Sequence, residues 1–152
     1  MLEIGCGHGI AVALVCEQVG TGKLTGIDRS EKMIEAAGKR NRACVEAGRA
    51  ELRAVALDKA DFGVGQFDTI FAINVNLFWT SKANELARMK AWLKPGGALY
   101  LFYQPPDPSG IERLTETITG TLTAHGFGTP QLTVKDLGKE KLIGFVAQPA
   151  GG

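Results

Sequence analysis

Three glycines at alternating positions, Gly5, Gly7 and Gly9, lie between a short apolar segment and a longer apolar run that starts at Ile10. This order predicts a strand, a glycine turn and a helix. Glycines suit such a turn because a residue without Cβ can take positive φ and let a ligand approach its amides. The first N–H groups of the following helix would face the same ligand. The turn is therefore a candidate site for binding a ligand through backbone amides.

A carboxylate follows the glycine turn at a distance suited to a nucleoside. Asp28 ends a second apolar segment, KLTGID, nineteen positions after Gly9 (28 minus 9). An acid at the tip of the neighbouring strand suits the two hydroxyls of a ribose. Ile10 stands where the dinucleotide fingerprint G-x-G-x-x-G needs its third glycine. The spacing favours a nucleoside ligand other than a nicotinamide dinucleotide, and a tight turn without a ligand stays the alternative.

Length and composition fit one globular domain spanning residues 1–152. Of the 152 residues, 45% are hydrophobic and 22% are charged, which is ordinary for a globular protein. The formal net charge of +1 gives no electrostatic footprint for nucleic acid or an anionic membrane surface. No signal-peptide pattern and no apolar span of about twenty residues is found, so we expect a cytoplasmic protein. The three cysteines lack a C-x-x-C spacing, which predicts reduced thiols and no metal site.

Apolar segments alternate in type along the chain and predict an α/β fold. Expected helices are Ile10–Val19, Ser30 to about Ala47, Ser81–Leu93 and Ser109 to about Gly126. Expected strands are Met1–Gly5, Lys23–Asp28, Glu51–Val55, Phe67–Asn74, Ala98–Tyr103, Gln131–Lys135 and Lys141–Ala147. The alternation implies parallel strands with right-handed crossovers. The last two strands are joined by a short connection and so form an antiparallel hairpin, with Leu132 and Val134 expected to face inward.

These segments together resemble a class I S-adenosylmethionine-dependent methyltransferase. The resemblance runs from LEIGCGHG through GIDRS, ALDKADF, QFDTIFAIN and LKPGG to the closing hairpin, essentially the whole chain. It implies a Rossmann-like, doubly wound sheet of seven strands in the order 3-2-1-4-5-7-6, mostly parallel, with the last strand antiparallel and helices on both faces. It also implies S-adenosylmethionine as methyl donor, S-adenosylhomocysteine as product, and an unidentified acceptor that we expect to be a small molecule.

The resemblance further implies which residues contact the cofactor. Glu3 matches the acid associated with its amino end, and Asp28 matches the acid that holds the ribose hydroxyls. Residues matched to the methionine part are Gly5, Cys6, Gly7, His8, Asn74 and Val75. Residues matched to the adenine ring are Arg29, Met33, Ala56 and Leu57. Many relatives carry an acid near Ala56; here Asp58 comes two positions later, and a solvated loop acid is its alternative.

Methyl transfer from a sulfonium asks for little from side chains. The methyl group is already activated, so positioning and exclusion of water supply most of the acceleration, and a dedicated base is optional. We name no catalytic residue, and we expect the acceptor outside the carboxyl ends of the strands. Candidate pocket residues there are Asn76, Phe78, Trp79, Tyr103 and Gln104. Packing at a strand end is the alternative for Tyr103, and loop anchoring is the alternative for Phe78 and Trp79.

The chain starts at its first strand, whereas relatives usually carry helices before it that cover the cofactor. We therefore expect an N-terminally short domain with weak binding or incomplete activity unless something covers the site, for example a second copy in a homodimer. Two other functions stay open. One is a non-catalytic module that binds S-adenosylmethionine or a partner. The other is a nicotinamide-dependent oxidoreductase, against which Ile10 and the closing hairpin argue.

Overall fold

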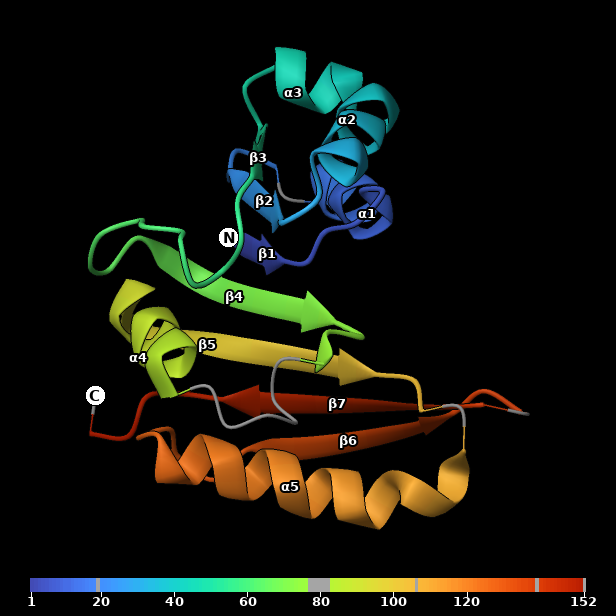
Figure 1. Cartoon of the computed structure of the whole chain (residues 1–152), viewed down its shortest axis with the longest axis vertical. Coiled ribbons are helices and arrows are strands. Elements are labelled where there is room, and N and C mark those ends of the chain that lie inside the picture. Colours follow the sequence, from blue (N-terminus) through green and yellow to red (C-terminus); the bar gives the residue numbers. More distant parts are fainter. Residues whose placement is uncertain (19, 77–82, 106, 139, 152) are drawn as a thin grey trace. The chain divides into compact units, whose positions relative to one another are not determined.

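A computed structural model describes the chain apart from residues 19, 77–82, 106, 139 and 152 (Figure 1). The described residues form a seven-stranded sheet in the order β3-β2-β1-β4-β5-β7-β6. Strand β2 pairs in parallel with β1 and β3, and β7 pairs antiparallel with β5 and β6. The predicted strand order and antiparallel last strand are confirmed.

The strands are β1 Leu2–Ile4, β2 Leu24–Asp28, β3 Ala50–Ala54, β4 Phe67–Ile73, β5 Leu93–Tyr103, β6 Gln131–Asp136 and β7 Lys141–Ala147. The helices are α1 Ile10–Gln18, α2 Glu31–Arg40, α3 Arg42–Glu46, α4 Ala83–Trp92 and α5 Ile111–Ala124, with a 3₁₀ turn at Pro108–Gly110. The chain divides into two compact units. The first is Met1–Asp61 with Ile70–Ala72, and the second is Phe62–Thr69 with Ile73–Gly152.

In the first unit, β1 is the strand that fixes the position of the glycine turn. It pairs in parallel with β2 on one side, where Ile4 lies opposite Ile27, and with residues of β4 on the other. Leu2, Ile4 and Ile27 are buried in the core of this unit. Because parallel strands end at the same edge, the residues after β1 and β2 come side by side. The turn and Asp28 are thereby placed together.

Helix α1 is buried on one side only. Val12 and Cys16 are buried, but Ile10 and Leu14 are 61% and 58% exposed. The apolar run from Ile10 to Val19 is typical of a helix buried on a sheet, but the outer side of this helix is exposed. The composition is apolar on both sides, and the described residues cover only the side that carries Val12 and Cys16.

The helix expected from Ser30 to about Ala47 is two helices. Its start is confirmed, because the Ser30 Oγ accepts a hydrogen bond from the Met33 N–H at 3.4 Å. It breaks at Asn41, whose φ of −106° and ψ of 23° are not helical. The short helix α3 begins at the next residue. An asparagine favours such a break because its side chain competes for backbone hydrogen bonds.

A disulfide bond joins helix α1, which precedes β2 in the sequence, to helix α3, which follows it. Cys16 of α1 and Cys44 of α3 are bonded, with their Cα atoms 6.3 Å apart and 28 positions apart in sequence. Cys6 is a buried free thiol. The expectation that all three cysteines are reduced was wrong, because pairing depends on proximity in the fold, which sequence spacing alone does not reveal.

We predict that reduction of the Cys16–Cys44 bond lowers the free energy of unfolding by about 3 kcal/mol, since closing a loop of this length restricts the unfolded chain. Urea denaturation followed by circular dichroism, with and without dithiothreitol, measures the loss. The double variant Cys16→Ser/Cys44→Ser serves as control and should not respond to the reductant. Complete alkylation of three thiols in the unreduced, unfolded protein would contradict the bond.

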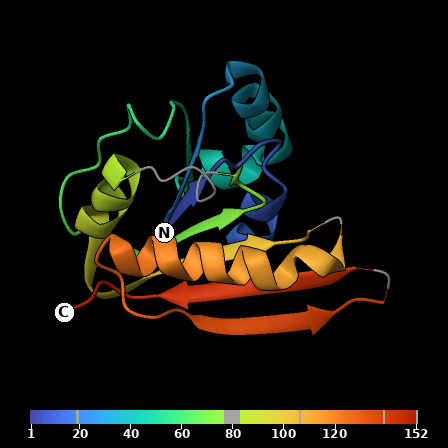
Figure 2. The same cartoon turned by 60° about the horizontal axis from the view of Figure 1, so that its bottom comes forward.

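In the second unit, α5 covers one side of the closing strands. It runs beside β6 and β7 (Figure 1 and Figure 2) and buries Leu114, Ile118 and Leu122. Strand β6 is exposed along its whole length. Leu132 and Val134, expected to face inward, are 45% and 48% exposed. That expectation was wrong: β6 is the last strand of the sheet, and its side chains stay exposed on both faces.

None of the described helices combines the length and the apolar character needed to cross a membrane.

Candidate functional site

All three glycines of the turn after β1 adopt positive φ. The values are 70° at Gly5, 51° at Gly7 and 74° at Gly9, a region that side chains other than glycine rarely occupy. The space around them differs. A Cβ on Gly9 would lie 2.4 Å from the Asn41 Nδ2, whereas no heavy atom lies within 4 Å of a Cβ built on Gly7. Gly9 is thus required by a close approach within the protein, and Gly7 borders open space.

The turn is held against the end of β2 by backbone hydrogen bonds. The N–H groups of Gly5 and Cys6 both donate to the Ile27 carbonyl, at 2.8 and 3.0 Å. The Gly9 N–H donates to the Cys6 carbonyl at 2.9 Å. The bend is therefore fixed before any ligand binds.

Asp28, at the end of β2, binds the glycine turn through its carboxylate. Its Oδ2 accepts a hydrogen bond from the Gly7 N–H at 3.0 Å, and its Oδ1 accepts one from the Ser30 N–H at 2.9 Å. The structure thus brings the predicted acid and the predicted turn into direct contact. Each carboxylate oxygen can accept a further hydrogen bond, because an ionised carboxylate offers about four acceptor positions. The half-buried Asp28 can therefore serve the protein and two ligand hydroxyls together.

Glu3 lies in β1 with an oxygen that has no partner. Its side chain is 3% exposed, and Oε2 is buried without a hydrogen bond among the described residues. Burial raises the pKa of the Glu3 carboxyl from 4.5 to about 7. An unpaired buried acceptor is costly and calls for an explanation. It can accept a hydrogen bond from a cationic or N–H donor of a ligand.

Cys6 offers its backbone rather than its thiol. The side chain is buried, and a Cβ built on Gly26 of β2 would lie 3.2 Å from the Cys6 Sγ. Burial, together with the negative charges of Glu3 and Asp28, raises the pKa of the Cys6 thiol to about 12. The group therefore stays protonated at neutral pH and packs against β2.

The predicted adenine residues follow the ends of β2 and β3. Arg29 is exposed, and Met33 in α2 is half-buried. The Val55 N–H donates to the Asp28 carbonyl at 2.9 Å, which keeps the segment with Ala56 and Leu57 beside the end of β2. Asp58 itself is exposed and pairs with Lys59 at 3.8 Å. Its contacts agree with a solvated loop acid.

Four of the predicted residues in the second unit come together where β4 and β5 end. Asn74, at φ 53°, accepts through Oδ1 from the Gln104 N–H at 2.8 Å. The Tyr103 hydroxyl donates to the Val75 carbonyl at 3.0 Å, and burial raises the pKa of this phenol above its usual range. Asn76 is exposed and follows directly. The predicted residues Phe78 and Trp79 lie outside the described part of the chain.

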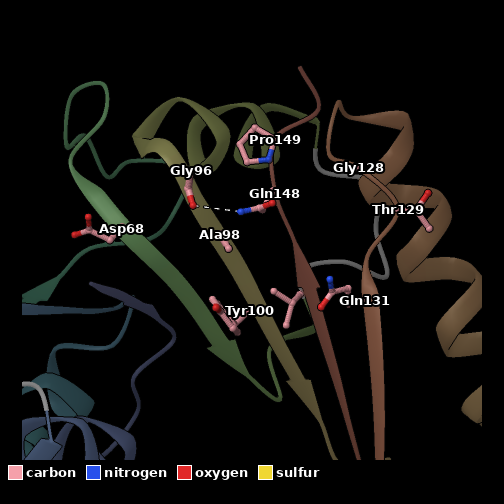
Figure 3. Close-up of a pocket in the computed structure, with 10 residues that line it drawn as sticks. Asp68, Gly96, Ala98, Tyr100, Gly128, Thr129, Gln131, Gln148 and Pro149 are labelled. Carbon is pink, nitrogen blue, oxygen red and sulfur yellow. Dashed lines mark hydrogen bonds between the residues drawn. The ribbon is translucent and has the colours of Figure 1, made fainter. Parts of the chain in front are cut away.

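A hollow of about 440 Å³ lies in the second unit, near the start of β5 and the end of β7 (Figure 3). Figure 3 shows Gly96, Ala98 and Tyr100 along β5 beside it, and Gln148 donating to the Gly96 carbonyl at 3.3 Å. None of the predicted acceptor residues that the structure describes, Asn76, Tyr103 and Gln104, lines this hollow. It lies at the other end of β5 from Tyr103 and Gln104.

Two residues next to the turn were missed by the sequence analysis. Arg40 donates from Nε to the His8 carbonyl at 3.1 Å. Asn41 donates from Nδ2 to the Gly9 carbonyl at 2.9 Å. The signal available in the sequence was an asparagine within a predicted helix, a position that asparagine disfavours.

We predict that ionisation of Glu3 destabilises the folded protein as the pH rises. Its folded pKa of about 7 exceeds the ordinary value of 4.5, so its contribution is fully present below the ordinary value and is lost as the pH approaches 7. The difference corresponds to about 3 kcal/mol. Relative to Glu3→Gln, which does not titrate, the wild-type free energy of unfolding should fall by that amount between about pH 4 and pH 8. Parallel denaturation profiles for the two proteins would contradict the raised pKa.

A family model described as a methyltransferase domain matches residues 1–97. A ribosomal protein L11 methyltransferase from Burkholderia thailandensis is 32% identical over 104 residues. This match covers 66% of the present chain but only 30% of that relative, so the chain spans less than a third of its length.

Solved structures resemble the chain over nearly its whole length. The [4+2]-cyclase SpnF has a TM-score of 0.78 at 18% identity, covering 99% of this chain and 75% of that one. A SAM-dependent methyltransferase from Aquifex aeolicus has a TM-score of 0.75 at 21% identity, with coverages of 96% and 79%. A geranyl diphosphate methyltransferase in complex with SAM has a TM-score of 0.74 at 15% identity, with coverages of 98% and 77%. At such identities the likeness concerns the fold.

Proposed function

Because the chain belongs to the methyltransferase domain family, we propose that it transfers a methyl group from S-adenosylmethionine to a small-molecule acceptor. The observation that carries the proposal is the hydrogen bond between the Gly7 N–H and the Asp28 carboxylate. It joins an amide-presenting turn to an acid at the neighbouring strand tip, the arrangement that suits an adenosyl group.

The residues of the first unit fit the cofactor. Asp28 keeps acceptor positions for the ribose hydroxyls after its bonds to Gly7 and Ser30. The open space beside Gly7 admits a ligand against the backbone. The unpartnered Oε2 of Glu3 suits the ammonium group of the methionine part. When bound, the cofactor supplies a sulfonium methyl that is already activated for transfer.

Glu3 would link cofactor binding to its own ionisation. An ammonium beside a buried carboxyl favours the ionised form and lowers its pKa. The carboxylate that destabilises the free protein at neutral pH would then gain a partner on binding. Glu3 would therefore contribute to affinity at a cost in stability, which is a common compromise at binding sites.

Of the residues in the second unit, Asn74 and Val75 are proposed to contact the methionine part of the cofactor, and Asn76, Tyr103 and Gln104 are proposed to line the acceptor pocket. The Tyr103 hydroxyl donates to a backbone carbonyl, so its role is to hold the segment after β4 rather than to take a proton. Phe78 and Trp79 remain proposed pocket residues. We assign no general base, because positioning and exclusion of water can supply most of the acceleration.

The share of each relative that the chain covers supports a small-molecule acceptor. The chain covers 77% of the geranyl diphosphate methyltransferase, whose named acceptor is small, but 30% of the relative named for a ribosomal protein.

A second copy of the chain is proposed to cover the cofactor, since Ile10 and Leu14 lie exposed directly after the turn. Light scattering after gel filtration, with and without cofactor, tests for the dimer; a monomer under both conditions contradicts it.

Isothermal titration calorimetry with S-adenosylmethionine, S-adenosylhomocysteine and NAD tests the cofactor. We expect binding of the first two and none of NAD. Binding of NAD alone would instead indicate an oxidoreductase, and no binding of any ligand would contradict the proposal. Transfer of label from S-adenosylmethionine to panels of small molecules and proteins then tests the acceptor. Label on proteins alone would contradict a small-molecule acceptor.

We predict that Asp28→Asn weakens binding of S-adenosylhomocysteine by about 10-fold to 100-fold, because hydrogen bonds to a charged group contribute about 1.5–3 kcal/mol. Calorimetry near neutral pH measures the change. Asp68→Asn is the matched control, since it removes an exposed carboxylate that pairs with Lys94 at 3.0 Å. Equal affinities of the two variants would contradict the proposed role of Asp28.

A further inference from the structure

Asn41 is a buried amide that reaches the glycine turn from a distant part of the sequence. The residue is 5% exposed. Its Nδ2 donates to the carbonyl of Gly9, which is 32 positions away, and to that of Ala37, both at 2.9 Å. A carboxamide nitrogen carries two hydrogens, so both donors are used. Aspartate, alanine or leucine at this position could not supply both bonds.

The break between α2 and α3 aims this side chain at the turn. The Asn41 N–H still donates to the Ala37 carbonyl at 2.9 Å, so α2 is complete up to this residue. The non-helical φ and ψ of Asn41 then redirect the chain before α3 begins. The contact is close enough that any side chain on Gly9 would collide with the Asn41 Nδ2. Asn41 and Gly9 therefore depend on one another.

The position of the Gly9 carbonyl also determines the start of α1 and the orientation of the next N–H group. This oxygen also accepts from the Ala13 N–H at 3.1 Å, the bond that starts α1. In a trans peptide the C=O and the following N–H point in opposite directions. Fixing the Gly9 oxygen thus orients the Ile10 N–H away from Asn41, and this N–H is among the first of α1, which have no partner within the helix.

Two further ties reinforce the same junction. Arg40, adjacent to Asn41, holds the preceding carbonyl, that of His8, at 3.1 Å. The disulfide from Cys44, three residues after Asn41, to Cys16 near the end of α1 fastens α3 to that helix. Successive carbonyls of the turn are thus held by successive residues of the α2–α3 junction.

We propose that Asn41 is a positioning residue for cofactor binding, which acts through the Gly9 carbonyl to hold the turn in its amide-presenting conformation. This inference rests on the proposed function. Asn41 does not itself touch the ligand, because its two donor hydrogens are taken by Gly9 and Ala37. The conformation required for binding then exists before the ligand arrives, which lowers the cost of ordering the turn.

Two substitutions separate positioning from simple stability. Asn41→Ser removes the bond to Gly9, while its hydroxyl can still donate to the carbonyl four residues earlier, that of Ala37. Arg49→Met is the matched control: the Arg49 Nη1 donates to the Cys16 carbonyl of α1 at 2.9 Å, away from the turn. Both variants lose one side-chain bond to a backbone carbonyl of the first unit. Asn41→Ala, which loses both bonds, extends the series if it folds.

The experiment measures S-adenosylhomocysteine affinity by calorimetry and amide hydrogen exchange of Gly9 and Ala13 by NMR in the ligand-free proteins, because these two amides are hydrogen-bonded within and directly after the turn. We expect Asn41→Ser to weaken binding by about 10-fold and to speed exchange at these two amides. We expect Arg49→Met to change affinity by less than about 2-fold at comparable thermal stability. Equal weakening by both variants, or unchanged exchange in Asn41→Ser, overturns the inference.

The outcome also separates this inference from the proposed function. If the wild-type protein binds neither S-adenosylmethionine nor S-adenosylhomocysteine, the proposed function fails. The exchange rates of Gly9 and Ala13 then decide whether Asn41 holds the turn, although no role in cofactor binding would remain. If the wild-type protein binds and Asn41→Ser binds equally well, the proposed function stands and the positioning role is wrong.

Discussion

The hydrogen bond from the Gly7 N–H to the Asp28 carboxylate is the contact on which the candidate site depends. It forms because β1 and β2 are parallel neighbours, so the turn after one strand and the acid ending the other meet at the same edge of the sheet. The glycines allow the backbone to bend there, and the Ile27 carbonyl fixes the bend from β2. A single pairing of two short strands thus produces both an amide surface and the carboxylate beside it.

The same pairing places a costly group in the core. Glu3 precedes the turn by two residues in β1, and its neighbours there, Leu2 and Ile4, are apolar and buried. The carboxyl therefore loses its hydration, and its pKa rises to about 7, while one oxygen lacks a partner. In a fold stabilised by apolar burial, an unpaired carboxylate lowers stability when it is ionised. Its presence is understandable if a ligand completes its hydrogen bonding, which agrees with the proposed cofactor site.

The sequence was informative where the signal is local or follows from parallel pairing. The turn, the position of Asp28, the helix start at Ser30 and the strand order were all predictable, since each depends on short-range pattern or on family resemblance. The Cys16–Cys44 bond, the Asn41–Gly9 contact and the exposure of Ile10 were not. Each of these depends on which segments meet in space, and Cys44 and Asn41 lie far in sequence from their partners. The facing of β6 was missed for a related reason: alternation of apolar residues does not reveal whether a strand ends a sheet.

The contacts of the first unit hold α1 near its end and hold the turn that precedes it. The disulfide and the Arg49 side chain fasten the helix at Cys16, and Arg40 and Asn41 hold the carbonyls of the turn that leads into it. These ties come from α2, α3 and the residue before β3, so the segment after β2 supports the segment after β1. The outer side of α1, in contrast, has few contacts, with Ile10 and Leu14 exposed. Such a division suits a binding turn, because the backbone that a ligand must meet is held from behind while the approach to it stays open.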